Sequence, residues 1–598
     1  MSSDDMLADA SPFPTLVAAL LPAFERNDWR AGSHQELSDI EGAICGVLLR
    51  LRARLNAIPI INRIPPEILQ YIFETTCSDK DSYSGYASCV VREKTSGWPF
   101  QLTLTHVCRT WRDAALGTPT LWTRIDYLND RLLELFLSRS GAAALSLHIE
   151  KQRPDALLQT QVDRLKRLDV TLTDRADRTF VPTLLQFRAP ALECLTILGR
   201  NGCPSPPETV SVVLFEEQVS SLKALALDHI GWWTPGNVFP CLTHLHLSSI
   251  VGNADAPDEV SYLTMFFANT PALQYVHVEG ITSGALAAGR PKHDEWRASL
   301  PSLRALTCSR SYAPGALHLL SSLELPLGVV VRMYGLTCMT PTSAVRPNVL
   351  LPPSILSTFT HLDIRANDSD LEVIMDGPTS SCVWLQMSAM HRYGIWEGWL
   401  AQLSTMLPLP SVRSLRAATD LPNVVPNLCS QLNASLVELS VYLKAEERDG
   451  LGVSDLAEDV PRRVYAALAG DDPSTCVPYL ESLKLETFCT DATVLRSPDL
   501  VSMAAIRAQQ GRPLRSLVVD TGNRSAHCSD SFSRELASVR KHVAGSVELR
   551  PGAAHSHFGL PDKFEVAEAE RWWDLPDDIK PRLRKSQSTS LSDFEDVD

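Results

Sequence analysis

The sequence predicts an α/β chain in which a helical N-terminal region is followed by an irregular leucine-rich-repeat solenoid. Two observations predict this fold. Apolar residues recur every three or four positions before residue 120, and short Leu-x-x-Leu-x-Leu segments recur between residues 164 and 550. The length agrees, because 598 residues are too many for one compact core and suit several domains or one elongated repeat array.

Composition and charge exclude several classes of partner. The chain has 55 Lys and Arg against 70 Asp and Glu, and this net charge of −15 opposes binding to nucleic acid over a broad surface. Its fourteen cysteines form no CxxC pair, which is typical of reduced thiols inside a cell. Because no run reaches about 18 apolar residues, we expect no membrane partner and a cytoplasmic or nuclear, or shared, location.

The first sixty residues predict a disordered segment and then a long helix. Residues 1–32 mix Asp, Ser and Pro without a sustained period, so we expect them to be disordered. Residues 33–58 carry an apolar stripe at helical spacing, and Ser33 with Glu36 forms a capping box at its start. An exposed stripe needs a partner surface. That surface is either the next domain of the same chain or a second helix in a coiled coil.

Two further helices are predicted before residue 120. The first lies within residues 61–77, where two prolines set the start and Glu67 occupies the first turn. A polar stretch at 78–99 has the composition of an inserted loop. The second helix covers residues 102–116 and is ended by Gly117 and Pro119.

The order of these elements resembles an F-box, whose pattern is Leu-Pro-x-Glu-hydrophobic, then Val-Cys-x-x-Trp-Arg, then Pro-x-Leu-Trp. The residues that carry the resemblance are Ile64, Pro65, Glu67, Ile68, Ile72, Val107, Cys108, Arg109, Trp111, Arg112, Pro119, Leu121 and Trp122. The segment at 121–150 is similar to the segment after the F-box in a large group of fungal F-box proteins. The resemblance places an F-box at residues 59–127, interrupted by the loop at 78–99.

The resemblance implies a protein partner. F-box helices dock on a small Skp-type adaptor, which links them to a cullin and to a ubiquitin-conjugating enzyme. Such docking needs an apolar cluster that one chain leaves exposed and the other buries. By position in the motif, the candidate adaptor-binding residues are Pro65, Ile68, Leu69, Ile72, Phe73, Leu104, Val107, Cys108 and Trp111. Part of this set could instead pack the F-box internally.

Repetition is the main feature of residues 128–560. Each recurring segment suits a short strand whose alternating leucines share one face. The segments are 164–172, 190–198, 221–230, 240–250, 271–280, 301–310, 361–364, 411–417, 435–443, 479–486, 513–520 and 546–550. The spacing predicts a solenoid of parallel strands with insertions at about 326–360 and 444–478. An ordinary α/β domain with leucine-rich strands is the alternative.

Residues 561–598 change character again. The segment 564–578 is short and amphipathic, with Trp572 and Trp573, and we expect it to pack on the last repeats. The basic and then acidic, serine-rich remainder lacks core-forming residues and is expected to be disordered.

No catalytic constellation is visible, so we expect a protein that is not an enzyme and needs no cofactor or metal. Cys108 is interpreted as a small core residue, and Cys194, Cys241 and Cys308 as buried spacers within the repeats. His244 and His246 alternate with leucines on one strand, which predicts two solvent-facing histidines without enough neighbouring ligands for a metal.

The predicted function is that of a substrate receptor in a Skp/cullin/F-box ubiquitin ligase, with the repeats binding an unknown protein. Candidates for substrate contact are the aromatic residues Trp232, Trp233, Trp396 and Trp399; the alternative is that they fill gaps in an irregular solenoid. Two alternatives stay open. One is an F-box scaffold without ubiquitin transfer, and the other is an enzyme whose site lies on loops of the solenoid.

Overall fold

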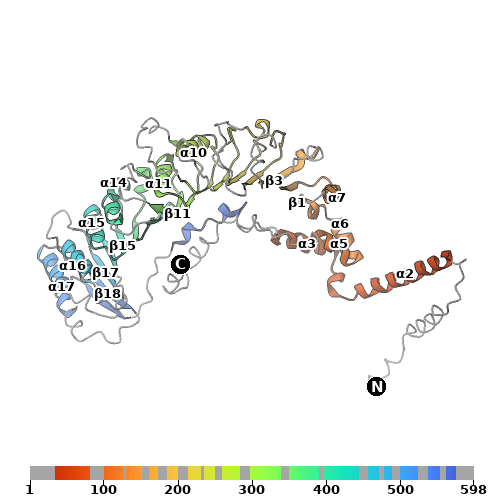
Figure 1. Ribbon diagram of the computed structural model, residues 1–598. Helices are drawn as coiled ribbons and strands as arrows, with labels where there is room; N and C mark the ends of the chain where they lie inside the picture. Colours follow the sequence, from red (N-terminus) through yellow and green to blue (C-terminus); the bar gives the residue numbers. More distant parts are fainter. Residues whose placement is uncertain are drawn as a thin grey trace, which may run out of the picture. The chain divides into compact units, whose positions relative to one another are not determined.

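The computed structural model (Figure 1) describes most of the chain in sixteen stretches. These are residues 34–80, 100–126, 130–150, 160–172, 185–199, 213–229, 235–248, 259–282, 297–338, 349–389, 395–443, 456–470, 477–487, 498–522, 536–551 and 560–573. The predicted disordered ends and most of the predicted loop at 78–99 lie outside these residues. The described residues belong to two compact units, one before and one after the boundary between Leu121 and Trp122.

The first unit is helical. Its elements are α2 (His34–Asn56), η1 (Ile60–Arg63), α3 (Pro66–Lys80), α5 (Phe100–Val107) and α6 (Arg109–Leu116), and α6 packs against both α3 and α5. The long helix predicted at 33–58 is confirmed by α2. Pro66 stands at the first position of α3 with Glu67 in its first turn, where a missing N–H and a negative charge are both favourable.

The single helix predicted at 102–116 is wrong in one respect. The backbone at Cys108 is extended, with φ −155° and ψ 174°, so the segment divides into α5 and α6. The apolar residues keep a helical spacing across the break, although the backbone does not. Leu104 before the break and Ala115 after it are both buried in this unit. A pattern of spacing therefore records which face is buried but not where the backbone turns.

The second unit is built on a sheet of 17 strands that is mostly parallel. Its strands are β1 (Arg124–Asp126), β2 (Leu145–Glu150), β3 (Leu165–Leu172), β4 (Cys194–Gly199), β5 (Ala224–Asp228), β6 (His244–Ser248), β7 (Tyr275–Glu279), β9 (Ala305–Ser309), β11 (Val330–Cys338), β12 (His361–Ala366), β13 (Asp370–Asp376), β14 (Cys382–Ala389), β15 (Ser414–Thr419), β16 (Glu438–Leu443), β17 (Ser482–Thr487), β18 (Ser516–Gly522) and β19 (Ser546–Pro551). A separate pair joins β8 (Ala298–Ser299) to β10 (Leu323–Glu324). Each of the twelve recurring leucine segments overlaps a strand of this sheet.

The strands pair in chain order over most of the sheet. From β1 to β7, and then through β9 to β11, each strand is parallel to the one before it. The same order holds from β15 to β19. Between them the chain doubles back, because β12, β13 and β14 form an antiparallel group in which β14 pairs with β11 and β12 pairs with β15.

The antiparallel group corrects the predicted insertion at 326–360. That range contains β11, which is a full member of the sheet, while the departure from regular order comes at residues 361–389. The second predicted insertion, 444–478, lies partly outside the described residues and contains the helix α16 (Leu456–Ala469).

Helices cover one face of the sheet. Along that face, Figure 1 shows α10 (Glu259–Ala268), α11 (Ala313–Ser321), α15 (Val424–Gln431), α16 and α17 (Pro498–Gln509). The remaining helices of this unit are α7 (Asp130–Ser140), α12 (Pro353–Leu356), α13 (Ile395–Ala401) and α14 (Leu403–Met406), with short 3-10 turns η2 (Pro119–Trp122), which begins in the first unit, η3 (Val162–Arg164) and η5 (Phe215–Glu217). We call the opposite side of the sheet the open face.

The C-terminal segment lies on the open face. Residues 560–573, here called the strap, contain two 3-10 turns, η7 (Asp562–Phe564) and η8 (Ala567–Glu570). The strap packs on strands from β4 to β14 and not on the last strands of the sheet, so the expected packing on the last repeats is wrong. Among the described residues, no helix combines the length and the apolar character that crossing a membrane requires.

Candidate functional site

The helical unit has a core made by half of the residues predicted to bind an adaptor. Leu69 and Phe73 on α3 are buried, as are Leu104 on α5 and Cys108 at the break. Trp111 is half-buried, and its ring lies 5.0 Å from that of Phe73. These side chains pack the helices of this unit together, which is the internal role that the sequence leaves open for part of the predicted set.

A polar contact fixes the start of this unit. Trp111 Nε1 donates a hydrogen bond of 2.7 Å to Asn62 Oδ1, and the Asn62 amide donates in turn to the carbonyl of Asn56. The chain before α3 is thereby tied to both α6 and the end of α2. Arg112 Nε adds a bond of 2.8 Å to the carbonyl of Thr105, which links α5 to α6 across the break.

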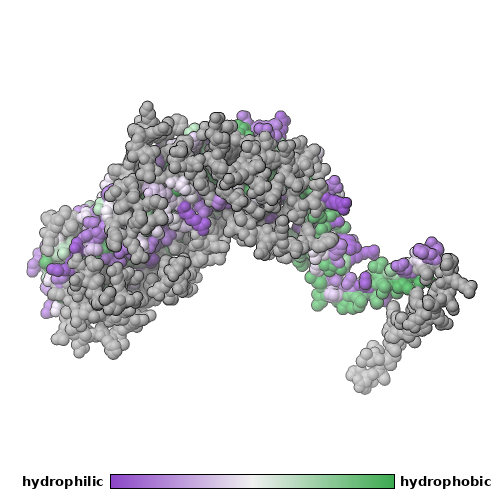
Figure 2. Space-filling model, viewed as in Figure 1, coloured by the Kyte–Doolittle hydropathy of each residue, from purple (hydrophilic) through white to green (hydrophobic). Residues whose placement is uncertain are grey.

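The other predicted residues face outward. Pro65, Ile68, Ile72 and Val107 are exposed, and Ile68 and Val107 each keep half of their side-chain surface accessible. Exposed apolar side chains that gather on one unit mark protein interaction surfaces. Figure 2 shows the apolar colour gathered over the helical unit. We call these four residues the F-box patch.

The long helix α2 extends this apolar character. Its exposed large side chains are Ile44, Val47, Leu48, Leu49, Leu51 and Leu55. In the described residues this stripe is not buried, so the choice between a domain partner and a coiled-coil partner stays open.

On the open face, one register position forms a continuous row across eight neighbouring strands from β3 to β14. The row consists of Asp169, Thr196, Ala226, His246, His277, Thr307, Arg332 and Trp384, each the pairing partner of the next. All eight are buried. Strands that are buried on both faces are typical of a covered parallel sheet, and here part of the cover is the strap.

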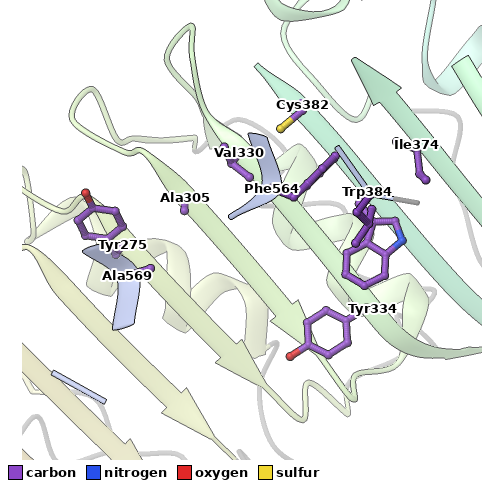
Figure 3. Packing of buried hydrophobic residues seen from close by; sticks show 10 residues of the cluster. Tyr275, Ala305, Val330, Tyr334, Ile374, Cys382, Trp384, Phe564 and Ala569 are labelled. Atoms are coloured by element: carbon purple, nitrogen blue, oxygen red, sulfur yellow. The ribbon is translucent and has the colours of Figure 1, made fainter. Parts of the chain in front are cut away.

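The strap anchors itself through aromatic side chains. Phe564 is fully buried in a cluster with Val330, Tyr334 and Trp384 (Figure 3). Trp573 is buried against Cys194, Ala224 and Ala226 on β4 and β5.

Polar contacts at both ends add to these anchors. His244 Nε2 donates a 2.9 Å hydrogen bond to the carbonyl of Glu568. Lys563 Nζ lies 3.4 Å from Asp376 Oδ2 and bonds the carbonyl of Gly377.

The buried histidines correct a prediction. His244 and His246 do face the side of the sheet opposite the helices, but the strap covers them, and neither is solvent-facing. The rings of His246 and His277 lie 4.4 Å apart. Burial lowers the pKa of His246 well below its ordinary value, and burial together with Arg332 lowers that of His277 to about 3. Both rings are therefore neutral at pH 7. Within the described residues no group of three metal-ligating side chains occurs.

The cysteines of the sheet are unreactive by the same argument. Cys194 and Cys308 are buried, as predicted, and burial raises the pKa of each thiol to about 12. Cys241 is exposed, so its interpretation as a buried spacer is wrong. It precedes β6 and therefore lies outside the alternation that buries the other two.

The aromatic candidates for substrate contact do not gather at a surface. Trp396 and Trp399 on α13, a helix that contacts α14 and α15, are both buried and are therefore corrected to packing residues. Trp232 and Trp233 lie outside the described residues.

Beyond the strap, the open face is polar and partly exposed. Asp363 on β12 pairs in register with Arg416 on β15, and Lys484 on β17 lies 2.6 Å from Glu486. Burial raises the pKa of Asp363 to about 6, although Arg416 opposes this shift. This half of the open face carries charges of both signs.

The sequence analysis did not single out Arg332, the residue on this face with three buried hydrogen-bond donor atoms that lack an acceptor. Arg332 is fully buried, and none of its three guanidinium nitrogens has a hydrogen-bond partner. It lies in Val330–Cys338, a valine-rich strand that carries no leucine motif. The usable signal was a lone arginine inside an apolar run, since arginine is almost never fully buried without a partner.

Comparison with known proteins bears on the first unit. Residues 61–127 match the family model described as F-box-like. A search of curated proteins found no match to the chain. The match covers the same helices whose core and exposed patch are described above, and the fungal and leucine-rich-repeat parts of the predicted resemblance are not tested by it. The chain therefore contains an F-box-like domain at residues 61–127, which is followed in the sequence by the strands of a long, mostly parallel sheet.

Proposed function

We propose that this chain is the substrate-receptor subunit of a Skp/cullin/F-box ubiquitin ligase. It docks a Skp-type adaptor through the F-box patch and binds a protein substrate on the open face of the sheet. The chain itself performs no catalytic step in this proposal. The single observation that carries it is the F-box-like match at residues 61–127, since F-box domains typically bind Skp-type adaptors.

The division between core and surface supports the adaptor half of the proposal. Leu69, Phe73 and Leu104 supply the core, while Ile68 and Val107 stay exposed on the same helical unit. A buried interfacial apolar side chain typically contributes about 2 kcal/mol or more to binding, which is about a thirtyfold change in Kd.

The sheet supports the receptor half. We infer an irregular leucine-rich-repeat solenoid, supported by parallel pairing in chain order and by the leucine motif in most strands. Repeat sheets of this kind present one register position after another along an extended surface. The partly exposed charges of Asp363, Arg365 and Lys484 are suited to contacts with a protein partner.

Co-purification with the adaptor tests the proposal. The full chain is compared with the double variant Ile68→Ser and Val107→Ser, which keeps the core and replaces two of the four apolar side chains of the F-box patch. We expect the adaptor to bind the parent chain in a one-to-one complex and the variant at least about thirtyfold more weakly. A matched control changes two equally exposed apolar residues of the second unit, Met265→Ser and Leu327→Ser.

The control should bind the adaptor as the parent does. If the folded parent chain fails to bind the adaptor, the ligase function is excluded. If both double variants lose binding equally, the F-box patch is not the docking surface.

A further inference from the structure

The strap leaves a buried cation without a bonding partner. Arg332 points into a small cavity whose lining includes His277, Thr307 and, from the strap, Ala569 and Trp573. Its Nε and both terminal nitrogens lack a hydrogen-bond partner, although the side chain is 0% exposed. Burying a guanidinium without hydrogen bonds opposes folding, and a carboxylate placed in bonding geometry would offset that cost.

Neighbouring groups do not meet this need. His277 donates or accepts at Nε2 with Ser309 Oγ at 3.0 Å, and its Nδ1 is also buried without a partner. The strap carries Glu570, whose charge acts favourably on Arg332, yet no hydrogen bond joins the two. The strap therefore has the right charge near the site but not the right placement.

We propose that the open face at β4–β14 binds an extended protein segment that has aromatic anchors and a carboxylate for Arg332, and that the strap is a built-in competitor for this site. The inference rests on the proposed function in taking the open face as the substrate surface. The substrate class is thus an aromatic and acidic segment of another protein, and release of the strap precedes its binding.

Two observations on the strap support this proposal. Its anchors, Phe564 and Trp573, are nine residues apart in sequence and occupy separate clusters, so the surface accepts an extended chain rather than a compact domain. The strap also shows why displacement needs a better ligand. It is tethered to the same chain, which gives it a high effective concentration, and a ligand from another chain competes only by supplying contacts that the strap lacks. The unmet guanidinium of Arg332 is such a contact.

The test uses the full chain and a labelled peptide with the sequence of residues 560–573. An opened variant, Phe564→Ala with Trp573→Ala, removes both aromatic anchors of the strap. A matched control changes two exposed strap residues, Glu565→Gln and Ala567→Ser. We expect the opened variant to bind the peptide at least tenfold more tightly than the parent chain, and the control to bind as the parent does.

The carboxylate is tested by a pair of peptides that carry Ala569→Glu or Ala569→Gln, because Ala569 is the strap residue that lines the cavity at Arg332 together with Trp573. In the opened variant, the Glu peptide should bind at least fivefold more tightly than the Gln peptide. Adding Arg332→Met, an apolar replacement of similar length, should abolish this preference. Arg507→Met is the contrasting fold control, because Arg507 is equally buried but donates to the carbonyls of Leu468, Val477 and Leu480, so only that change should lower the unfolding midpoint markedly.

Each result has one meaning. Equal peptide binding by the parent chain and the opened variant would show that the strap is not a competitor. Equal binding of the Glu and Gln peptides would remove Arg332 from recognition. A chain that binds the adaptor but ignores the peptide overturns this inference alone, whereas a chain that binds the peptide but not the adaptor overturns the proposed function alone.

Discussion

His277 shows how one buried residue makes the stability of the sheet depend on pH. Its ring is neutral in the folded protein because burial and the nearby Arg332 lower its pKa to about 3. In the unfolded chain a histidine takes up a proton near pH 6.5. Between these two values the unfolded state binds more protons than the folded state, so stability falls as pH falls through this window.

The prediction concerns His277→Gln compared with the parent chain. Between pH 7 and pH 5 the parent should lose about 2 kcal/mol more free energy of unfolding than the variant, because each pH unit below 6.5 is worth about 1.4 kcal/mol for one such group. Urea unfolding at the two pH values measures this difference. The exposed His361→Gln serves as the control and should lose stability in parallel with the parent. A parent and His277→Gln that respond identically would show that the ring titrates normally.

At the scale of elements, the predictable part of the fold is the part encoded by spacing. Leucines at fixed intervals placed β5 and β6 correctly, because their side chains must all face the helices. The strand β11 was missed since its apolar run is rich in valine and contains no leucine pair. The strap was misplaced because its binding site is at least 176 residues away in sequence, the separation of Leu560 from Trp384, and such pairing depends on tertiary contacts alone.

The candidate site was predictable to the same limited extent. Motif order identified the F-box residues, but spacing could not separate Leu69, which is core, from Ile68, which is exposed. Adjacent positions on a short helix with a wide apolar face differ by only about 100° around its axis. The buried row on the open face was hidden for a different reason, since its polar members look solvent-facing until the covering segment is known.

The turn after β13 provides a prediction at this scale. A Cβ added at Gly377 would lie 2.0 Å from the carbonyl oxygen of Thr358, so Gly377→Ala requires the backbone to move. We expect a loss of about 3 kcal/mol in the free energy of unfolding, the size of an overpacked core substitution. A Cβ added at Gly398 in α13 has no other atom within 4 Å. Gly398→Ala should therefore raise the free energy of unfolding by about 1 kcal/mol. Thermal and urea unfolding compare the two. A Gly377→Ala protein as stable as its parent would contradict the close approach of β13 to Thr358.

At the scale of the whole molecule, the two proposed binding functions belong to separate sets of residues. The F-box patch belongs to the helical unit, and the site at Arg332 belongs to the sheet unit. The two sets share no residue, and each unit has its own core. Changes at sites without shared partners usually add to within about 0.5 kcal/mol.

Adaptor binding and peptide binding should therefore be independent. In the opened variant, combining Ile68→Ser with Arg332→Met should weaken adaptor binding as much as Ile68→Ser alone does. Its effect on peptide binding should equal that of Arg332→Met alone, and both comparisons should agree to within about twofold. Titrating the labelled peptide with and without saturating adaptor checks the same point, because any coupling must appear reciprocally in both affinities. A fivefold change in peptide affinity on adding adaptor would show instead that the F-box and the open face communicate, and release of the strap would then be a step that adaptor binding controls.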